Sequence, residues 1–317
     1  MADIRGGRSP NGVRRQAPKH RLNREQIVYA LDRHHPPALE IDPGDEVVLE
    51  TWDARTGTIR EDRDLLDHAH PLGTNPATGP IRVREAEPGD VLVVDVLRID
   101  LADSGFIAVK AGQGLLAHLA PEYATRILPV HDGAAWFGDR LRLPLRPMVG
   151  VVGTTPAGQA VSTGDPGPHG GNMDNRLLTA GARVYLPVLV EGALLGLGDV
   201  HGVMGDGEIS FLGLEICATV TVQVDLVKQG GLPGFRGRAL IETPESWVTT
   251  AEHLDMVQAA RLAAEEMAAL MQTRLGLSFT EAYMLMSAVV DVQLCQCCQP
   301  GVFPVTTRAV ISKEIMP

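Results

Sequence analysis

The sequence predicts an α+β protein in which a β-rich body, made of sandwich-like or barrel-like sheets, precedes a C-terminal helical pair. Glycine and proline are plentiful, with 34 and 22 of the 317 residues, which favours many turns and short strands. Segments rich in β-branched residues fill the first two thirds of the chain. Apolar residues at helical spacing follow only after residue 249.

Turn signals and alternation predict the strands. "DPGDEVVLET" (42–51) and "EPGDVLVVDV" (87–96) each combine a Pro-Gly-Asp turn with an apolar strand. "EICATVTVQVDLV" (215–227) alternates so that every second side chain shares one face. "TTRAVIS" (306–312) is strand-like, and a short helix is predicted near Leu115–Ala120.

Two amphipathic helices are predicted at residues 249–277 and 278–293. Each starts with a capping box, formed by Thr249 with Glu252 and by Ser278 with Glu281. The Met and Leu stripe of the first helix is interpreted as core.

Residues 1–24 are rich in arginine, glycine and proline and predict a solvated, flexible tail, with a docking arm or a transit-like segment as the alternatives. Residues 25–317 are expected to form a single domain. The net charge of −11 argues against nucleic acid or an anionic membrane as the main partner. It also mildly disfavours a highly anionic substrate. No apolar run is long enough for a transmembrane helix and no secretory signal is recognised, so a cytoplasmic location is expected.

The cysteines are Cys217 and the "CQCCQ" cluster at Cys295, Cys297 and Cys298. This spacing lacks the paired C-x-x-C pattern of a zinc site. We therefore expect structural thiols, with a metal or redox role as the alternative.

One short stretch, "GDVHGVMGDGEIS" (198–210), concentrates metal and proton chemistry. On a strand, Asp199 and His201 share a face, and the Gly205–Gly207 turn can bring Glu208 back towards them. An imidazole and carboxylates that converge suit a divalent metal. The alternative is that the acids are turn residues and the histidine is a satisfied core imidazole.

A second stretch, "GPHGGNMDN" (167–175), repeats this composition with His169, Asn172 and Asp174. Gly170 and Gly171 can aim backbone N–H groups at a bound oxygen. Two such loops in one chain favour a shared site over two unrelated turns. Weaker candidates are His68 with His70 as a metal pair, and Asp291 on the second helix.

These two loops resemble the acetamidase/formamidase family. The resemblance is collinear and extends over 36–54, 75–94, 167–178, 184–210 and 279–296, and "GPHGGNMD" with "GDxHxxxGDGE" is its most specific part. It implies a metal-dependent hydrolase of short primary amides that releases ammonia and a carboxylate. It also implies a β-rich α+β fold and a homodimer or larger homo-oligomer.

The resemblance carries a site to this chain by position, with an acidic match at Asp291. The metal, Zn²⁺ with Ca²⁺ as the alternative, would be held by Asp174, Asp199 and His201, and His169 is an alternative ligand. Glu208 would act as general base, and Asn172 or the N–H groups of Gly170 and Gly171 would hold the oxyanion, so the catalytic set is Glu208, Asn172 and His169.

The sequence departs from the family pattern at Met204, where Gln is expected, and at Gly202, where Ala is expected. We interpret Met204, with Gly170 and Gly171, as part of a substrate pocket for an amide larger than formamide. The alternative is that Met204 packs in the core. The alternative function is a non-haem Fe(II) oxygenase, with His169, His201 and one carboxylate as ligands.

Overall fold

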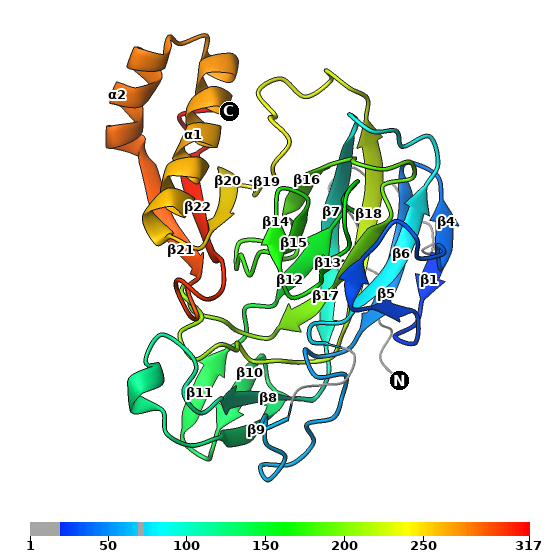
Figure 1. Ribbon diagram of the computed structural model, residues 1–317, viewed down its shortest axis with the longest axis vertical. Helices are drawn as coiled ribbons and strands as arrows, with labels where there is room; N and C mark the ends of the chain where they lie inside the picture. The colour runs from blue at the N-terminus through cyan, green and yellow to red at the C-terminus, as the bar shows by residue number, and fades with distance from the viewer. Residues whose placement is uncertain (1–19, 69–72) are drawn as a thin grey trace, which may run out of the picture.

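A computed structural model describes residues 20–68 and 73–317 (Figure 1). The predicted tail therefore lies mostly outside the described residues, as does His70. His20–Leu22 nevertheless form strand β1, which pairs in parallel with β5 (Asp45–Thr51). The folded body thus includes residues that the sequence assigned to the tail, because backbone pairing with β5 orders them.

Two large sheets form the body of the described chain. In the first, nine strands of residues 20–68 and 73–317 follow the order β1, β5, β18 (Ala218–Val227), β7 (Val91–Leu101), β16 (Arg183–Pro187), β19 (Leu240–Glu242), β20 (Ser246–His253), β22 (Val305–Ser312) and β21 (Val290–Gln296). In the second, the order is β14 (Pro166–Gly167), β15 (Gly170–Asn172), β12 (Met148–Gly153), β17 (Leu195–His201), β6 (Ala77–Val83) and β2 (Ile27–Val28), with β4 (Leu39–Ile41) also paired to β6.

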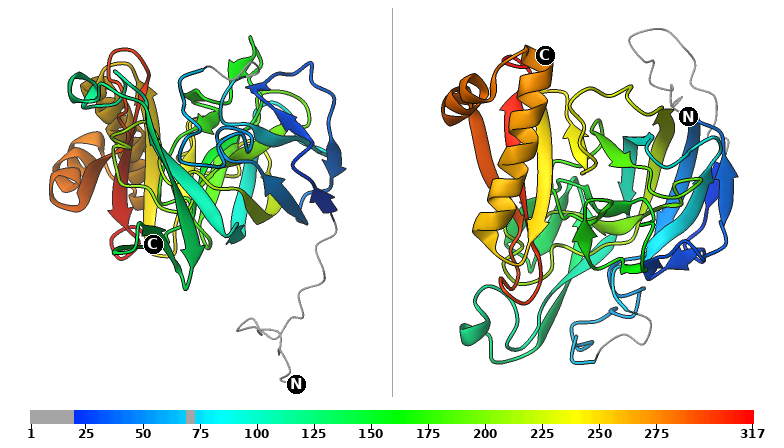
Figure 2. Two further views of the ribbon diagram at one scale, coloured as in Figure 1. Left: turned by 90° about the horizontal axis from the view of Figure 1, so that it is seen from below. Right: turned by 45° about the horizontal axis from the view of Figure 1, so that its top comes forward.

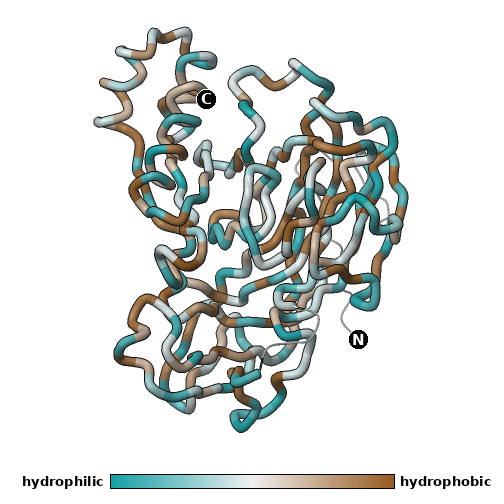
Figure 3. The backbone as a smooth tube through the Cα atoms, in the orientation of Figure 1, coloured by the Kyte–Doolittle hydropathy of each residue, from teal (hydrophilic) through white to brown (hydrophobic). Residues whose placement is uncertain are grey.

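The main core lies between these sheets. Val94 and Val220 of the first sheet and Ile81 and Leu195 of the second are fully buried in one apolar cluster. Strand β18 alternates buried and less buried positions as its sequence predicts. Figure 3 shows hydrophobic stretches along these strands. This packing confirms the predicted β-rich α+β body.

A smaller sheet projects at one end of the molecule (Figure 1). It comprises β8 (Ser104–Val109), β9 (Ala124–His131), β10 (Ala134–Phe137) and β11 (Leu141–Pro144), and a 3₁₀ turn at Ala117–Leu119 stands where a short helix was predicted. The strands β3 (Ala30–Leu31) and β13 (Val161–Ser162) pair separately. A bridge from Phe106 to Glu215 joins the smaller sheet to the body.

The helical pair packs on the outer end of the first sheet (Figure 2). Helix α1 (Met256–Leu275) buries Met267 and Met271 against Trp247 and Ile311 of the sheet, and α2 (Phe279–Val289) follows it. The helix pair and the Ser278–Glu281 capping box are confirmed. No helix in residues 20–68 and 73–317 is long and apolar enough to cross a membrane.

Both predicted helices were too long. Thr249 and Glu252 lie in strand β20, so their predicted capping box is wrong, and the N-cap of α1 is Asp255, which accepts from the N–H of Gln258 at 2.8 Å. The second helix ends at Val289, and Asp291 is an exposed residue of β21. Pairing of β20 and β21 with β22 accounts for both differences.

Candidate metal centre

Strand β17 supplies the centre of the candidate site. Asp199 and His201 are both 1% exposed and lie on the same face of the strand, with Nε2 of His201 3.7 Å from Oδ1 of Asp199. Asp174, just after β15, brings its Oδ1 to 3.9 Å from Nδ1 of His201. The two glycine-rich loops therefore meet, as the sequence predicts.

Glycine at position 150 makes this convergence sterically feasible. A Cβ atom at Gly150 on β12 would lie 2.5 Å from Oδ1 of Asp174 and 3.0 Å from Oδ2 of Asp199. Both carboxylates therefore occupy space that any other residue would fill. Gly213 does the same for the ring of His201, whose Cγ would lie 2.9 Å from a Cβ there.

Two further acids join His201 from the other side. The turn at Gly205–Gly207 returns Glu208 to the cluster, and Glu208 is 6% exposed. Glu215 is 1% exposed; its Oε1 lies 3.0 Å from Nε2 of His201 and accepts from the N–H of Gly213 at 3.1 Å. His201 therefore lies at the junction of two acidic groups.

The donor atoms in this cluster fit a divalent cation. Oδ1 of Asp174, Oδ1 of Asp199 and Nδ1 of His201 are buried, and none has a hydrogen-bond partner among the described residues. Buried polar atoms are rarely left without partners. One set of candidate ligands is Asp174, Asp199 and His201, and a second is His201, Glu208 and Glu215. Nitrogen and carboxylate oxygens are ligands for Zn²⁺.

Neutral side chains orient the acids. The amide of Asn75 donates to Oδ2 of Asp199 at 2.9 Å, and the amide of Gln296 donates to Oδ2 of Asp174. The thiol of Cys298 donates to Oε2 of Glu208 at 3.3 Å. In each of these acids a neutral side chain therefore holds one carboxylate oxygen. The other oxygen of Asp174 and of Asp199, Oδ1, has no partner among the described residues.

Burial controls the pKa values of the metal-free cluster. It raises the pKa of Asp174 to about 6 and, with the nearby charge of Asp174, raises the pKa of Glu208 to about 8. Burial and the charge of Glu215 raise the pKa of Asp199 well above its ordinary value. Burial alone would lower the pKa of His201, but the charges of Glu215 and Asp199 outweigh it and raise that pKa well above its ordinary value. A bound cation would offset this crowding of negative charge.

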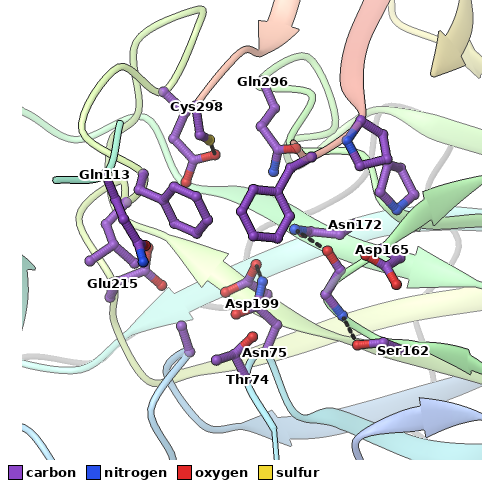
Figure 4. Close-up of a pocket in the computed structure, with 18 of the residues that line it drawn as sticks. Thr74, Asn75, Gln113, Ser162, Asp165, Asn172, Asp199, Glu215, Gln296 and Cys298 are labelled. Atoms are coloured by element: carbon purple, nitrogen blue, oxygen red, sulfur yellow. Dashed lines mark hydrogen bonds between the residues drawn. The ribbon is translucent and has the colours of Figure 1, made fainter. Parts of the chain in front are cut away.

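A cavity of about 290 Å³ opens onto this cluster (Figure 4). Asn172, Asp199, Glu208 and Glu215 line it on the polar side. The other lining residues include Arg55, Lys110, Gln113, Phe211, Leu212 and Phe303. The cavity thus combines buried carboxylates with apolar and cationic walls.

Some predicted pocket residues do not line this cavity. Met204 is 5% exposed, in line with the alternative that it packs in the core, and neither Gly170 nor Gly171 is at the cavity wall. A Cβ at Gly171 would lie 2.4 Å from the carbonyl oxygen of Asp165, so close backbone packing explains that glycine. Asn172 does line the cavity, and its Oδ1 has no partner among the described residues.

His169 lies apart from the metal-binding groups. It is 4% exposed and packs beside Gly167 and Gly171, where a Cβ would come within 2.5 and 3.0 Å of its ring nitrogens. Burial lowers its pKa to about 4. Each candidate ligand group among the described residues contains only one histidine, His201. The two-histidine set of the oxygenase alternative therefore finds no support.

The remaining candidates have different outcomes. His68 is exposed, with Asp67 at 3.7 Å as its partner, and lies outside the cluster. The three clustered cysteines are buried free thiols, as expected for structural thiols: Cys295, Cys297 and Cys298. Cys298 also lines the cavity. Asp291 was expected on the second helix as a weaker site candidate. It is instead an exposed residue of β21, which does not favour a role in the site.

Sequence reasoning missed Glu215, Asn75, Gln296 and Gly150. Glu215 appeared only as the first residue of a predicted strand segment (215–227), and Asn75 only as the first residue of a segment that resembles the family (75–94). Glu215 stands at the start of an alternating segment that also carries Asp225, so nothing distinguished it from an exposed acid. Gln296 and Gly150 carried no signal either.

Comparison with known proteins gives a consistent result. The model of the acetamidase/formamidase family matches residues 18–164 and 157–310. An acetamidase of Mycolicibacterium smegmatis is 30% identical over 277 residues, covering 65% of this chain and 68% of that protein. A formamidase of Methylophilus methylotrophus is 29% identical over 273 residues, covering 65% of this chain and 66% of its own. The chain thus matches about two thirds of the length of these relatives.

Solved structures extend the likeness along the chain. An acetamidase from Bacillus halodurans has a TM-score of 0.89 at 36% identity, covering 93% of this chain and 98% of its own. An acetamidase from Yersinia enterocolitica has a TM-score of 0.88 at 27% identity, covering 98% of this chain and 96% of its own. The fold, the two glycine-rich loops and these matches agree, and the chain belongs to the acetamidase/formamidase family.

Proposed function

We propose that the protein is a metal-dependent hydrolase that cleaves the C–N bond of a primary amide and releases ammonia and a carboxylate. Membership in the family assigns the chain to the amidohydrolases. The observation that carries the metal dependence is the buried set of partnerless atoms on Asp174, Asp199 and His201 beside the cavity.

We assign the ligand role to these three residues and name Zn²⁺ as the favoured ion, with Ca²⁺ as the alternative. When bound, the ion supplies a Lewis acid that activates water and polarises a carbonyl group. Asn75 and Gln296 hold the outer oxygens of Asp199 and Asp174, which orients the remaining oxygens.

Glu208 is assigned the proton transfer. It lines the cavity and belongs to a candidate ligand group that contains His201, where a carboxylate can accept and return a proton. It would accept a proton from the attacking water and deliver it to the leaving nitrogen. The thiol of Cys298 holds Oε2 of Glu208, which fixes the direction of the carboxylate. Asn172, at the cavity wall, is positioned to bind the substrate amide.

The substrate is proposed to be larger than formamide. The cavity of about 290 Å³ lies near the lower limit of ordinary ligand pockets and exceeds the needs of a three-heavy-atom amide. Apolar side chains of Phe211, Leu212 and Phe303 give an acyl chain surface to contact.

Metal removal tests the proposal. Chelated protein, with the metal content measured, should release no ammonia from a panel of primary amides, and added Zn²⁺ or Ca²⁺ should restore release under anaerobic conditions. Unchanged ammonia release after verified metal removal would rule out the metal dependence.

We also propose a homodimer or larger homo-oligomer. Phe279, Tyr283 and Met284 form an exposed apolar surface on α2, 57%, 62% and 65% exposed. Contiguous exposed apolar side chains commonly mark protein interfaces. Light scattering should give a multimer mass that the double substitution Tyr283→Glu and Met284→Glu reduces, and a monomer mass for the unaltered protein would contradict the proposal.

A further inference from the structure

The cavity wall carries two cations that the proposed reaction does not use. Lys110 follows β8, and Arg55 lies in the loop after β5; both line the cavity. Gln113, from the same segment as Lys110, lies on the Glu215 side of the cavity, away from Ser162 and Asp165 (Figure 4). The polar side chains on this side therefore face the same cavity as Asp199, one of the proposed metal ligands.

Lys110 has no anionic partner in the structure. Within residues 20–68 and 73–317 its ammonium group forms no ion pair or hydrogen bond, and its Nζ lies over the ring of Phe211, 4.6 Å from the centroid. Burial, followed by the charge of Arg55, lowers the pKa of Lys110. The positive charge of Lys110 is therefore not neutralised by an ion pair, although the carboxylates of Glu208 and Glu215 are near.

Arg55 is similarly incomplete. It is 7% exposed, and its Nε is buried without a partner among the described residues. One terminal nitrogen donates to the carbonyl of His68 at 2.8 Å. The Asp53 carboxylate forms no ion pair with the guanidinium among the described residues; its Oδ1 accepts from the backbone N–H groups of Arg55 and Gly57, and its Oδ2 accepts from the thiol of Cys217. Buried charges of this kind are normally paired, so an external anion would complete the site.

The acids of the cluster do not fill this need once they bind a cation. Asp174, Asp199 and His201 would then direct their free atoms to the metal, Glu208 is held by Cys298, and Glu215 is held by His201 and Gly213 and forms no ion pair with Lys110 or Arg55 among the described residues. Phe211 and Leu212 line the same cavity as the two cations, and their apolar surfaces suit methylene groups.

We propose that the preferred substrate is a primary amide whose acyl chain ends in a single carboxylate, and that Lys110 and Arg55 bind this carboxylate as specificity-determining residues. This inference rests on the proposed amide hydrolysis for its reaction, but the anion site rests on the unpaired cations. One carboxylate is also compatible with the acidic protein as a whole, whose net charge of −11 disfavours a polyanion.

An isosteric pair of amides tests the substrate class. 3-Carbamoylpropanoate and 4-methylpentanamide share a chain and a shape but differ in a terminal carboxylate or isopropyl group. The metal-loaded protein should prefer the carboxylate by at least about tenfold in kcat/KM, the low end for a hydrogen bond to a charged group. Lys110→Met should abolish the preference mainly through KM, and Lys110→Arg should retain most of it.

Arg261→Met is the matched control. Arg261 is an exposed residue of α1 whose one ion-pair partner among the described residues is Glu265, so its replacement changes the net charge equally without altering the cavity. It should leave the preference intact. Hydrolysis of both amides at equal rates by the unaltered protein would overturn the carboxylate proposal while the amidase function stands. An equal loss on both amides in Lys110→Met would also overturn it.

A binding measurement separates this inference from the reaction. Butanedioate and 4-methylpentanoate each offer one carboxylate to the metal and differ only at the far end. Calorimetry should give butanedioate an advantage of at least about tenfold that Lys110→Met removes. The same advantage without ammonia release from any amide would support the anion site and refute the proposed function. No advantage in the unaltered protein would overturn the anion site.

Discussion

Three acids of the site adopt left-handed backbone conformations. The φ angles are +42° at Asp174, +53° at Asp199 and +44° at Glu208. Such conformations cost roughly 1–3 kcal/mol each for a residue with a side chain, and they persist where the surroundings determine them. Their occurrence at three buried acids of one cluster indicates that the fold tolerates this local backbone strain because it orients the three carboxylates.

Glu208 provides the most direct test of the proposed chemistry. Glu208→Gln keeps the size of the side chain but removes its ability to accept a proton. We expect turnover to fall by at least about a hundredfold, with metal retained, because general-base catalysis typically contributes that much. Steady-state ammonia release and elemental analysis on the same sample measure both quantities. Near-normal turnover in the metal-loaded variant would remove Glu208 from the mechanism.

His201 should control metal retention as well as turnover. His201→Ala deletes the one side chain that both candidate ligand groups share. We expect metal occupancy to fall together with activity, because a first ligand is lost. His169→Ala is the comparison variant, since His169 lies outside both groups and should leave occupancy largely unchanged. Full occupancy in His201→Ala would place the ion elsewhere.

Among the site residues, the sequence revealed those that lie close together along the chain. Asp199, His201 and Glu208 share one glycine-rich stretch, so their type and spacing were enough to group them. Asn75 and Gln296 donate to Asp199 and Asp174, which lie far from them in the sequence. Only the folded sheets bring these pairs together, so neither residue type nor spacing predicts them. Met204 is buried and does not line the cavity, a placement that the sequence pattern could not give because it does not tell which side of a loop faces inward.

Among the elements, β22 connects the sheet to both loops of the site. Its Arg308 is 0% exposed; the guanidinium donates to Asp206 at 2.7 Å, to Asn175 at 3.2 Å and to Gln293 at 2.8 Å. Asp206 belongs to the loop of Glu208, and Asn175 follows Asp174. One buried side chain thus fixes the spacing of the two loops.

Replacing Arg308 should therefore lower both stability and turnover. Arg308→Met removes the buried guanidinium that donates to Asp206, Asn175 and Gln293, and each buried acceptor left unpaired typically costs about 1–3 kcal/mol of unfolding free energy. We expect a clear fall in melting temperature and in kcat. Arg308→Lys should restore little of the lost stability or turnover, because an ammonium group cannot donate in the three directions of Asp206, Asn175 and Gln293.

Arg176→Met is the control for this prediction. Arg176 contacts the same carboxylate at 2.8 Å but is 37% exposed, so its pair should contribute far less. Equal losses in the two variants would show that Asp206 depends on charge alone and not on the buried guanidinium.

The same strand explains where element boundaries could not be predicted. Thr249 and Asp291 both lie within patterns that suit a helix, yet each belongs to a strand paired with β22. The capping box at Ser278 depends only on neighbours and was predictable. The boundaries at β20 and β21 depend on a partner strand that follows later in the chain.

For the molecule as a whole, the metal-free protein should lose stability as the pH rises. Glu208, Asp199 and His201 have folded-state pKa values above their ordinary values, so the folded state binds more protons than the unfolded state. Their contribution to stability is present below the unfolded pKa and is lost as the pH rises through the folded pKa, which is about 8 for Glu208.

Thermal unfolding between pH 7 and 9 measures this effect, a range chosen around the Glu208 pKa of about 8. With chelator present, the melting temperature should fall across that range. Glu208→Gln should flatten part of the slope, and saturating Zn²⁺ should raise and flatten the curve because ligands then bind metal instead of protons. A metal-free melting temperature that climbs with pH would contradict the assigned directions.

The dispersion of the site along the chain has a consequence for biosynthesis. Asn75 leaves the ribosome long before Gln296, Cys298 and Arg308, and the acids in between have no complete set of supporting partners until β21 and β22 have paired. Tight binding of the proposed metal ion would then be one of the last events of folding. An ion bound at that stage would stabilise only chains in which β21 and β22 have paired. The metal supply in the cell would therefore favour completely folded molecules.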